Sequence, residues 1–313
     1  MTTASAEYNG LVIARYSNFY AVEDCDGNIT QCVSRKKLSP LCGDYITWES
    51  SGDGGVITTV MPRRSVLTRP DRRGQPKETA ANIDQLIVVN AIPKVAGEEA
   101  SYEFNTALTD RYIVAAELLG ATPLILLNKC DLASAETIDK MELALKIYQA
   151  IGYTTLLTST KTERGSACPL GIEALNAELC DKTSIFVGES GAGKSSLINA
   201  IMPQLGIRTN EVSTHSGLGR HTTTTSMLYH LPQGGDLIDS PGVREFGLWQ
   251  VDTSQLAQGF REFKPYLGEC RFRNCSHHHN AGCAVEAAAK EGKISPVRME
   301  SYYSIYDDLN SSD

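Results

Sequence analysis

Residues 184–195 read SIFVGESGAGKS, a short apolar stretch followed by the pattern G-x-x-x-x-G-K-S. This pattern is typical of a phosphate-binding loop when a strand precedes it and a helix follows it. Ser184 to Val187 is predicted to be the strand, and a helix is predicted to start near Lys194. The glycines would let backbone amides turn towards phosphate groups, Lys194 would reach the terminal phosphates, and the Ser195 hydroxyl would bind Mg²⁺. The stretch therefore predicts an α/β nucleotide-binding domain.

A second motif, Asn128-Lys129-Cys130-Asp131, follows the apolar strand predicted over Leu124 to Leu127. Ligands of open α/β sheets bind at the carboxyl ends of the strands, where this tetrapeptide lies. Asp131 can accept hydrogen bonds from two guanine donors, and adenine would leave it unsatisfied at a cost of about 1–3 kcal/mol. Lys129 would lie along the base, and Asn128 would hold the loop. Because an ordinary GTPase has the two motifs in the reverse order, a circularly permuted GTPase domain is predicted.

Further nucleotide contacts are expected after the neighbouring strands. Thr158-Ser159-Thr160 comes at the end of the next predicted strand, where backbone amides could meet the guanine carbonyl, although an ordinary strand-end turn explains these residues equally well. Asp239 follows the predicted strand Asp236 to Ile238 and is expected to hold Mg²⁺ through water, with the Gly242 amide close to the third phosphate. Either Thr222 or Thr223 could supply the switch hydroxyl to Mg²⁺, and we favour Thr223.

The residue after Gly242 is Val243, where many GTPases have a glutamine that orients the attacking water. Valine cannot do this, and His221 is the best replacement on side-chain chemistry. The alternative is that His221 only positions the switch or contacts a partner. In either case, intrinsic hydrolysis is expected to be slow and to need a partner that orders the switch.

These motifs predict a full set of site residues. The predicted nucleotide contacts are Asn128, Lys129, Asp131, Ser159, Thr160, Gly188, Glu189, Ser190, Gly191, Ala192, Gly193, Lys194, Ser195, Ser196, Thr223 and Asp239. The predicted magnesium ligands are Ser195 and Thr223, and the predicted catalytic residues are His221, Lys194 and Gly242.

The chain of 313 residues is too long for one core, since single cores rarely exceed about 250 residues. We predict a multidomain protein: an all-β OB barrel with a basic linker in residues 1–75, a permuted α/β P-loop domain in residues 76–246, and a mainly α zinc-binding domain in residues 247–313. Five short β runs between residues 10 and 60 predict the barrel, a fold that often binds nucleic acid. A barrel that only packs on its neighbour remains the alternative.

Residues 61–80 are predicted to be an irregular linker, because prolines and a glycine interrupt them. They hold six basic residues against two acidic ones, in a chain whose net charge is -8. The overall charge argues against a general nucleic-acid coat, so this local segment is the expected contact with a phosphate backbone.

Cys270, Cys275, His277 and Cys283 lie within fourteen residues near the end of the chain. Three thiolates and one imidazole suit a closed tetrahedral zinc site, so one structural zinc ion is predicted. The neighbouring His278 and His279 leave open which imidazole binds. Between Arg261 and Arg298, basic residues outnumber acidic ones seven to four, which suits a zinc module that faces RNA.

Composition adds broad limits. No apolar run approaches the roughly 20 residues that a membrane span requires, and the first ten residues lack the pattern of a signal peptide. Nine cysteines, an odd number without the spacing of a small secreted domain, fit a reducing compartment. The expected location is the cytoplasm, with no membrane partner, and a monomer is expected.

The combined motifs resemble those of the RsgA (YjeQ) family of circularly permuted GTPases, which act in late maturation of the small ribosomal subunit. The resemblance includes the swapped motif order, Cys42-Gly43-Asp44, Ala81 to Gln85, Asp110-Arg111-Tyr112, Gly219 to Thr224 and the zinc spacing. It implies an OB barrel, a central GTPase and a zinc domain that together engage 16S rRNA and the 30S subunit. It also implies hydrolysis of GTP to GDP and phosphate stimulated by the subunit, His277 as the imidazole ligand, and the histidine matching His221 as catalytic.

Two positions depart from the family pattern, namely Ser240 in place of threonine and the residues 279–282 before the last cysteine. Neither removes a predicted ligand, so only local loop geometry is in doubt. Two other function classes remain. The first is a nucleic-acid-binding module that uses GTP only as a structural ligand, and single-turnover hydrolysis with and without 30S subunits would distinguish it from a GTPase. The second is a P-loop kinase or ATPase, which a nucleotide competition assay would distinguish.

Overall fold

The computed structural model describes residues 8–70, 75–92, 104–161, 171–205, 226–239, 251 and 253–311. Residues 10–60 form a closed five-stranded barrel of β1 (Gly10–Arg15), β2 (Tyr20–Glu23), β3 (Ile29–Ser34), β4 (Tyr45–Ser51) and β5 (Gly54–Val60). The barrel closes because β1 pairs with β4 as well as with β2. Its interior is filled by the apolar side chains that alternate along the strands: Val12, Val22, Cys32, Ile46 and Ile57. All five predicted barrel strands are therefore present.

The segment that follows the barrel is not an irregular linker, and that prediction was wrong. It forms a two-stranded antiparallel hairpin of β6 (Val66–Pro70) and β7 (Pro76–Ala81). Pro70, the last residue of β6, is paired with Pro76, the first residue of β7. At this position the missing proline N–H groups cost the ladder little, so the prolines end the strands and do not break them.

The prediction for the basic residues of this segment was also wrong in part. The Arg63 guanidinium donates to both carboxylate oxygens of Asp44 at 2.8 Å and to Glu78 at 3.1 Å. Arg64 forms an ion pair with Asp84 at the start of the central domain. These two arginines are therefore bound to carboxylates within the chain and hold the barrel against its neighbour.

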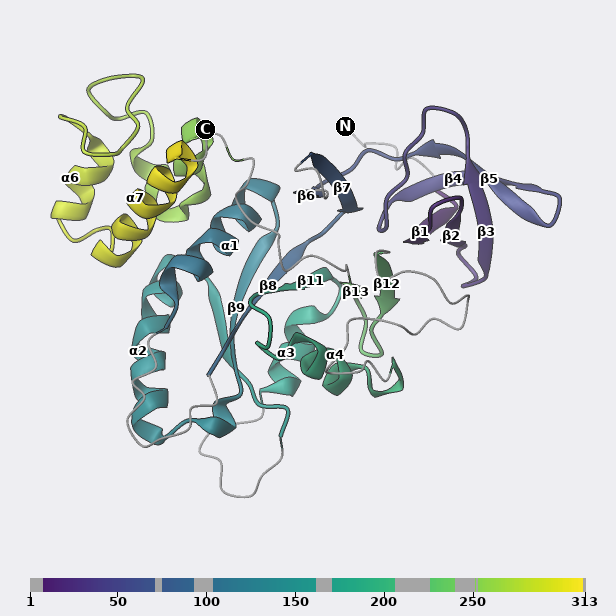
Figure 1. The fold of residues 1–313 in the computed structure, drawn as a ribbon, viewed down its shortest axis with the longest axis horizontal. Helices are drawn as coiled ribbons and strands as arrows, with labels where there is room; N and C mark the ends of the chain where they lie inside the picture. The colour runs from purple at the N-terminus through teal and green to yellow at the C-terminus, as the bar shows by residue number, and fades with distance from the viewer. Residues whose placement is uncertain are drawn as a thin grey trace, which may run out of the picture.

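The central sheet has the order β10-β9-β8-β11-β13-β12 (Figure 1). Its strands are β8 (Gln85–Ala91), β9 (Thr122–Asn128), β10 (Thr154–Leu157), β11 (Thr183–Val187), β12 (Met227–His230) and β13 (Asp236–Asp239). The first five in this order are parallel, and β12 is antiparallel to β13. β12 was not predicted.

Helices cover both faces of this sheet. They are α1 (Thr106–Leu119), α2 (Ala135–Ile151), α3 (Ile172–Leu179) and α4 (Lys194–Ile201), with short 3-10 turns η1 (Cys130–Leu132) and η2 (Pro203–Leu205). Along β8, Leu86 and Val88 belong to the core that α1 shares, whereas Ile87 and Val89 belong to the core under α3 and α4. Because successive side chains of a strand point to opposite faces, such a strand must be apolar throughout.

The C-terminal part is helical and packs on α1 (Figure 1). It comprises α5 (Thr253–Leu256), η4 (Ala257–Gly259), η5 (Arg261–Tyr266), α6 (Ala284–Lys290) and α7 (Pro296–Ser311). Phe260, Phe263 and Tyr302 are buried and belong to the same apolar cluster as the residues of α1. The division into domains at residues 75 and 246 stays a prediction, since cores here run across both positions.

The barrel adjoins the sheet at its β12 edge, where Ala14 of β1 pairs with Met227. His230 at the end of β12 lies between Glu23 of β2 and Asp236 of β13, with ring nitrogens 2.5 and 2.6 Å from the carboxylate oxygens. Among the described residues, no helix is both long and apolar enough to span a membrane.

Candidate nucleotide site and metal cluster

The predicted phosphate-binding loop connects β11 to α4, as the motif requires. Two of its glycines are needed for close contacts. A Cβ atom on Gly188 would lie 2.3 Å from the Val89 carbonyl oxygen, and one on Gly193 would lie 2.3 Å from Nδ2 of Asn128. Both glycines also have positive φ angles, 133° and 95°. The loop therefore turns tightly against β8 and against the guanine motif, which side chains at these positions would prevent.

Lys194 begins α4 and folds back over the loop. Its ammonium group donates to the carbonyl oxygens of Gly188 and Glu189, each at 2.7 Å. The backbone amides at the start of a helix have no partners within the helix and attract anions. Lys194 and the first turn of α4 therefore bring positive charge to one place, which suits a polyphosphate.

The guanine motif contacts the phosphate-binding loop directly, although the two are about 60 residues apart in sequence. Nδ2 of Asn128 donates to the Ala192 carbonyl at 2.9 Å, and the Lys129 ammonium donates to the Gly191 carbonyl at 2.6 Å. Asn128 ends β9, and Lys129 has a positive φ of 62°. The sharp turn after β9 is what places both side chains over the loop.

Asp131 lies one turn further on, and its side chain is only 5% exposed. The Ser159 hydroxyl donates to its Oδ1 atom at 2.6 Å, and the Lys161 ammonium is 3.7 Å from Oδ2. The Thr158 hydroxyl donates to Oδ1 of Asn128 at 3.2 Å. The structure thus joins the predicted Ser159 to the guanine motif. Sequence reasoning missed the contribution of Lys161 and the side-chain hydrogen bond of Thr158, because only the parallel pairing of β10 with β9 brings these side chains there.

Other predicted residues are placed less fully. Thr160 follows Ser159 and is exposed. Asp239 is the last residue of β13, which runs parallel to β11, so both strands end at the edge of the sheet where the phosphate-binding loop lies. His221, Thr223 and Gly242 lie outside the described residues.

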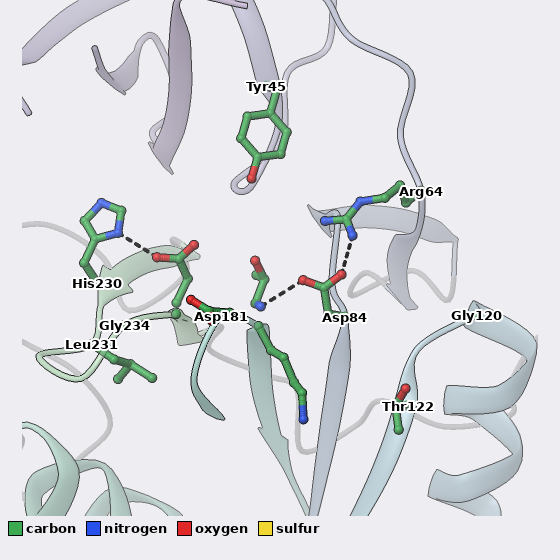
Figure 2. A pocket seen from close by; sticks show the side chains of 13 residues that line it. Tyr45, Arg64, Asp84, Gly120, Thr122, Asp181, His230, Leu231 and Gly234 are labelled. Atoms are coloured by element: carbon green, nitrogen blue, oxygen red, sulfur yellow. Dashed lines mark hydrogen bonds and ion pairs between the residues drawn. The ribbon is translucent and has the colours of Figure 1, made fainter. Parts of the chain in front are cut away.

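A separate pocket of about 800 Å³ lies between the barrel and the central domain (Figure 2). Tyr45, Arg64, Asp84 and His230 are among its lining residues. Asp84 precedes β8 and Thr183 begins β11, so the pocket lies at the amino ends of the parallel strands. This is the sheet edge opposite the guanine motif and the phosphate-binding loop, and the pocket is not the nucleotide site.

The metal-ligand prediction is supported by the geometry of the C-terminal cluster. The ligand atoms of Cys270, Cys275, His277 and Cys283 all lie within 4.8 Å of one another. Nδ1 of His277 is 3.5 Å from Sγ of Cys270 and 3.4 Å from Sγ of Cys283. Four such donors around one point suit a single structural metal ion with no position left for a substrate.

Two observations make the fit more specific. Backbone amides of Ala284 and Glu286 donate to the sulfurs of Cys270 and Cys283, at 3.3 and 3.5 Å, as expected for ligand sulfurs that carry negative charge. Burial raises the pKa of the Cys283 thiol to about 12, and a bound cation would favour its thiolate form.

The neighbouring histidines point elsewhere. His278 approaches Asp307 of α7 at 3.0 Å and stacks on Tyr306 with ring centroids 4.8 Å apart, whereas His279 is exposed. In the structure, the imidazole of the cluster is that of His277.

Known proteins share both the sequence and the fold. The family model described as RsgA GTPase matches residues 60–249. A small ribosomal subunit biogenesis GTPase RsgA of Haemophilus influenzae is 46% identical over 309 residues, which cover 97% of this chain and 85% of that protein. A protein of the same name from Hahella chejuensis is 45% identical over 315 residues, covering 99% of this chain and 86% of that protein.

Two crystal structures have a similar fold. YjeQ from Thermotoga maritima has a TM-score of 0.76 and 30% identity, covering 96% of this chain and 98% of that chain. YloQ, described as a circularly permuted GTPase, has a TM-score of 0.74 and 27% identity, covering 100% of this chain and 99% of that chain. The predicted resemblance and fold class are confirmed. The chain therefore belongs to the RsgA family, whose members are circularly permuted GTP hydrolases of small ribosomal subunit biogenesis.

Proposed function

We propose that this protein binds the 30S ribosomal subunit through 16S rRNA and hydrolyses GTP there during late maturation of the subunit, which stimulates the hydrolysis. The observation that carries the proposal is the contact between the two nucleotide motifs. Asn128 and Lys129 donate hydrogen bonds to the phosphate-binding loop, so one nucleotide can reach both. The printed names of the curated relatives supply the link to the small subunit.

In this proposal each residue of the nucleotide site has a role. Lys194 and the amides of the loop hold the phosphates, Asp131 accepts hydrogen bonds from guanine, and Ser159 with Thr160 borders the base. Ser195 and Thr223 would hold Mg²⁺, with Asp239 nearby, and the ion would neutralise charge on the phosphates. The preference for GTP over ATP rests on Asp131, because guanine offers its buried carboxylate two donors that adenine lacks.

The attacking water needs a group to orient it, and Val243 supplies none. We assign this role to His221, with the Gly242 amide close to the third phosphate. Both residues belong to segments on either side of β12 and β13. Contact of the ribosomal subunit with these segments would explain stimulated turnover.

We assign zinc to the cluster of three cysteines and one histidine. Zinc ligands lie about 2.0–2.3 Å from the ion in a tetrahedral site, and the observed donor separations of 3.4 and 3.5 Å fit such a site. The ion would stabilise the loops between η5 and α6. It takes no part in the hydrolysis, since the cluster offers no open position.

The barrel and its hairpin are the proposed rRNA-facing elements at the N-terminal end. Arg69 and Lys77 are paired directly across the β6–β7 hairpin. Like charges in this position repel each other, and a phosphate backbone would relieve the repulsion. A factor with this role works in the cytoplasm, and we propose that it does so as a monomer.

The test is GTP hydrolysis by the purified protein with and without salt-washed 30S subunits. A large stimulation supports the proposal, and turnover that is unchanged by 30S subunits argues against it. Lys194→Ala is the control variant, because loss of the ammonium group at the start of α4 should abolish tight GTP binding. Undiminished affinity in this variant would mean that the loop is not the phosphate site.

A further inference from the structure

The loop between the first two cysteines of the metal cluster presents an aromatic ring to solvent. Phe272 is 51% exposed, and few other large apolar residues are exposed in the part of the chain that the structure describes. Its neighbours Arg271, Arg273 and Asn274 are also exposed. The loop belongs to the segment between η5 and α6, which lies on the side of the C-terminal part away from the central sheet (Figure 1).

The exposure of Phe272 is imposed by its surroundings. Cys270 and Cys275, two donors of the cluster, hold both ends of the loop. The Arg271 amide donates to the Gly282 carbonyl at 3.0 Å, and the Cys275 amide donates to the Phe272 carbonyl at 3.3 Å. The backbone that carries the ring is therefore held before any partner binds, which reduces the conformational entropy lost on binding.

The charge around the ring points to an anionic partner. Among the described residues, neither Arg271 nor Arg273 has a carboxylate within ion-pair distance, whereas Arg261 and Lys264 both bind Glu117. The guanidinium carbon of Arg271 lies 5.4 Å from the centroid of the Phe272 ring. An exposed aromatic face with two uncompensated cations beside it is the combination that binds single-stranded nucleic acid.

We infer that an unpaired base of RNA stacks on Phe272 while its backbone phosphates contact Arg271 and Arg273. The inference rests on the proposed function, because it places 16S rRNA at this loop. A base within a duplex is covered on both faces by its neighbours, so only an unstacked base of a loop, bulge or strand end can use the ring. A protein partner would cover the aromatic ring but would need its own carboxylates for both arginines.

The test uses the full-length, zinc-loaded protein and measures its dissociation constant for 30S subunits at several salt concentrations. Phe272→Ala and Phe272→Leu should each weaken binding about tenfold, since stacking contributes about 1–3 kcal/mol per base. Phe272→Tyr should bind like the wild type. Leu143→Ala is the matched control, because Leu143 is also apolar and is 66% exposed, on α2.

The salt dependence of binding distinguishes the contribution of the arginines from that of the Phe272 ring. Arg271→Ala should reduce the slope of log affinity against log salt by about one, whereas Phe272→Leu should leave the slope unchanged. Zinc content, measured in every variant, shows that the cluster is intact. The inference would be overturned if either Phe272→Ala or Phe272→Leu bound 30S subunits with wild-type affinity. The proposed function would still stand in that case. A wild-type protein that does not bind 30S subunits would overturn both.

A photoreactive phenylalanine analogue in place of Phe272 identifies the partner directly. Cross-linking to 16S rRNA at an unpaired nucleotide is the expected result. Cross-linking to a ribosomal protein alone would refute the inference.

Discussion

Arg298 of α7 is a fully buried cation that joins the C-terminal helices to the central domain. Its Nη1 atom lies 2.5 Å from the Asp110 carboxylate of α1, and its Nε atom lies 2.6 Å from the Glu262 carboxylate of η5. The guanidinium also covers the ring of Phe260 at 4.5 Å. We predict that Arg298→Met, which keeps the volume and removes the charge, strongly destabilises this junction.

The magnitude follows from what the substitution leaves behind. The Asp110 and Glu262 side chains are 0% and 9% exposed, so two carboxylates with little or no access to solvent would lose their cation. Breaking a buried ion pair in this way costs about 3–5 kcal/mol. That is a large part of the roughly 5–15 kcal/mol by which most domains are stable.

The loss of stability caused by Arg298→Met should also depend on pH. Burial raises the pKa of the Asp110 carboxyl, whereas the charge of Arg298 lowers it. Without Arg298 the folded protein binds a proton at Asp110 that the unfolded chain releases, so the stability of the variant falls as pH rises. The loss relative to wild type should be larger at pH 8 than at pH 5.

Urea unfolding followed by circular dichroism at both pH values measures these differences. The matched variant is Asp110→Asn in the Arg298→Met background, which removes the unpaired charge and should recover at least about 1 kcal/mol. The reasoning would be refuted by a loss below about 1 kcal/mol in Arg298→Met. It would also be refuted if Asp110→Asn were equally destabilising with and without Arg298.

Three further predictions concern the catalytic, metal and interdomain residues. His221→Ala should keep GTP affinity and lose the turnover stimulated by 30S subunits; unchanged single-turnover rates would move the catalytic role elsewhere. Cys275→Ser should release the metal, and full zinc content by elemental analysis would contradict the ligand set. Partial burial lowers the pKa of His230, but hydrogen bonds to Glu23 and Asp236 raise it overall. The protonated His230 therefore stabilises the fold fully at pH values below the pKa of histidine in the unfolded chain. This stabilisation is lost as pH rises through the higher pKa that His230 has in the folded protein. His230→Gln should destabilise the protein at pH 6 by less than about 1 kcal/mol, because the side chain is half exposed, and should have no effect at pH 9.

Much of the architecture follows from local patterns. The barrel strands, the strands β9, β10, β11 and β13, and the helix α4 lie within a few residues of their predicted positions. Short apolar runs bounded by turn residues or by a motif mark these elements in the sequence. The hairpin after the barrel was missed because prolines were taken to break strands, although here they end them.

The candidate site was predicted in its motifs but not in its connections. Gly188 to Ser195 and Asn128 to Asp131 are recognisable because each packs its chemistry into a few consecutive residues. Lys161 carries no such signal, and it reaches the guanine motif only through the pairing of two parallel strands. The role of Arg63 was misjudged for the same reason, since its partner Asp44 is nineteen residues away.

The sequence by itself determined which chemistry the chain carries: a phosphate-binding loop, a guanine motif in swapped order and four metal donors. Each of these motifs consists of residues that are close together in the sequence, so it can be recognised without the fold. Only the tertiary structure decided which partners neutralise each buried charge. Asp110 and Arg298 are far apart in sequence, and they meet because α1 and α7 bury their apolar faces against each other. Burial then makes an unpaired charge so costly that the pair must form.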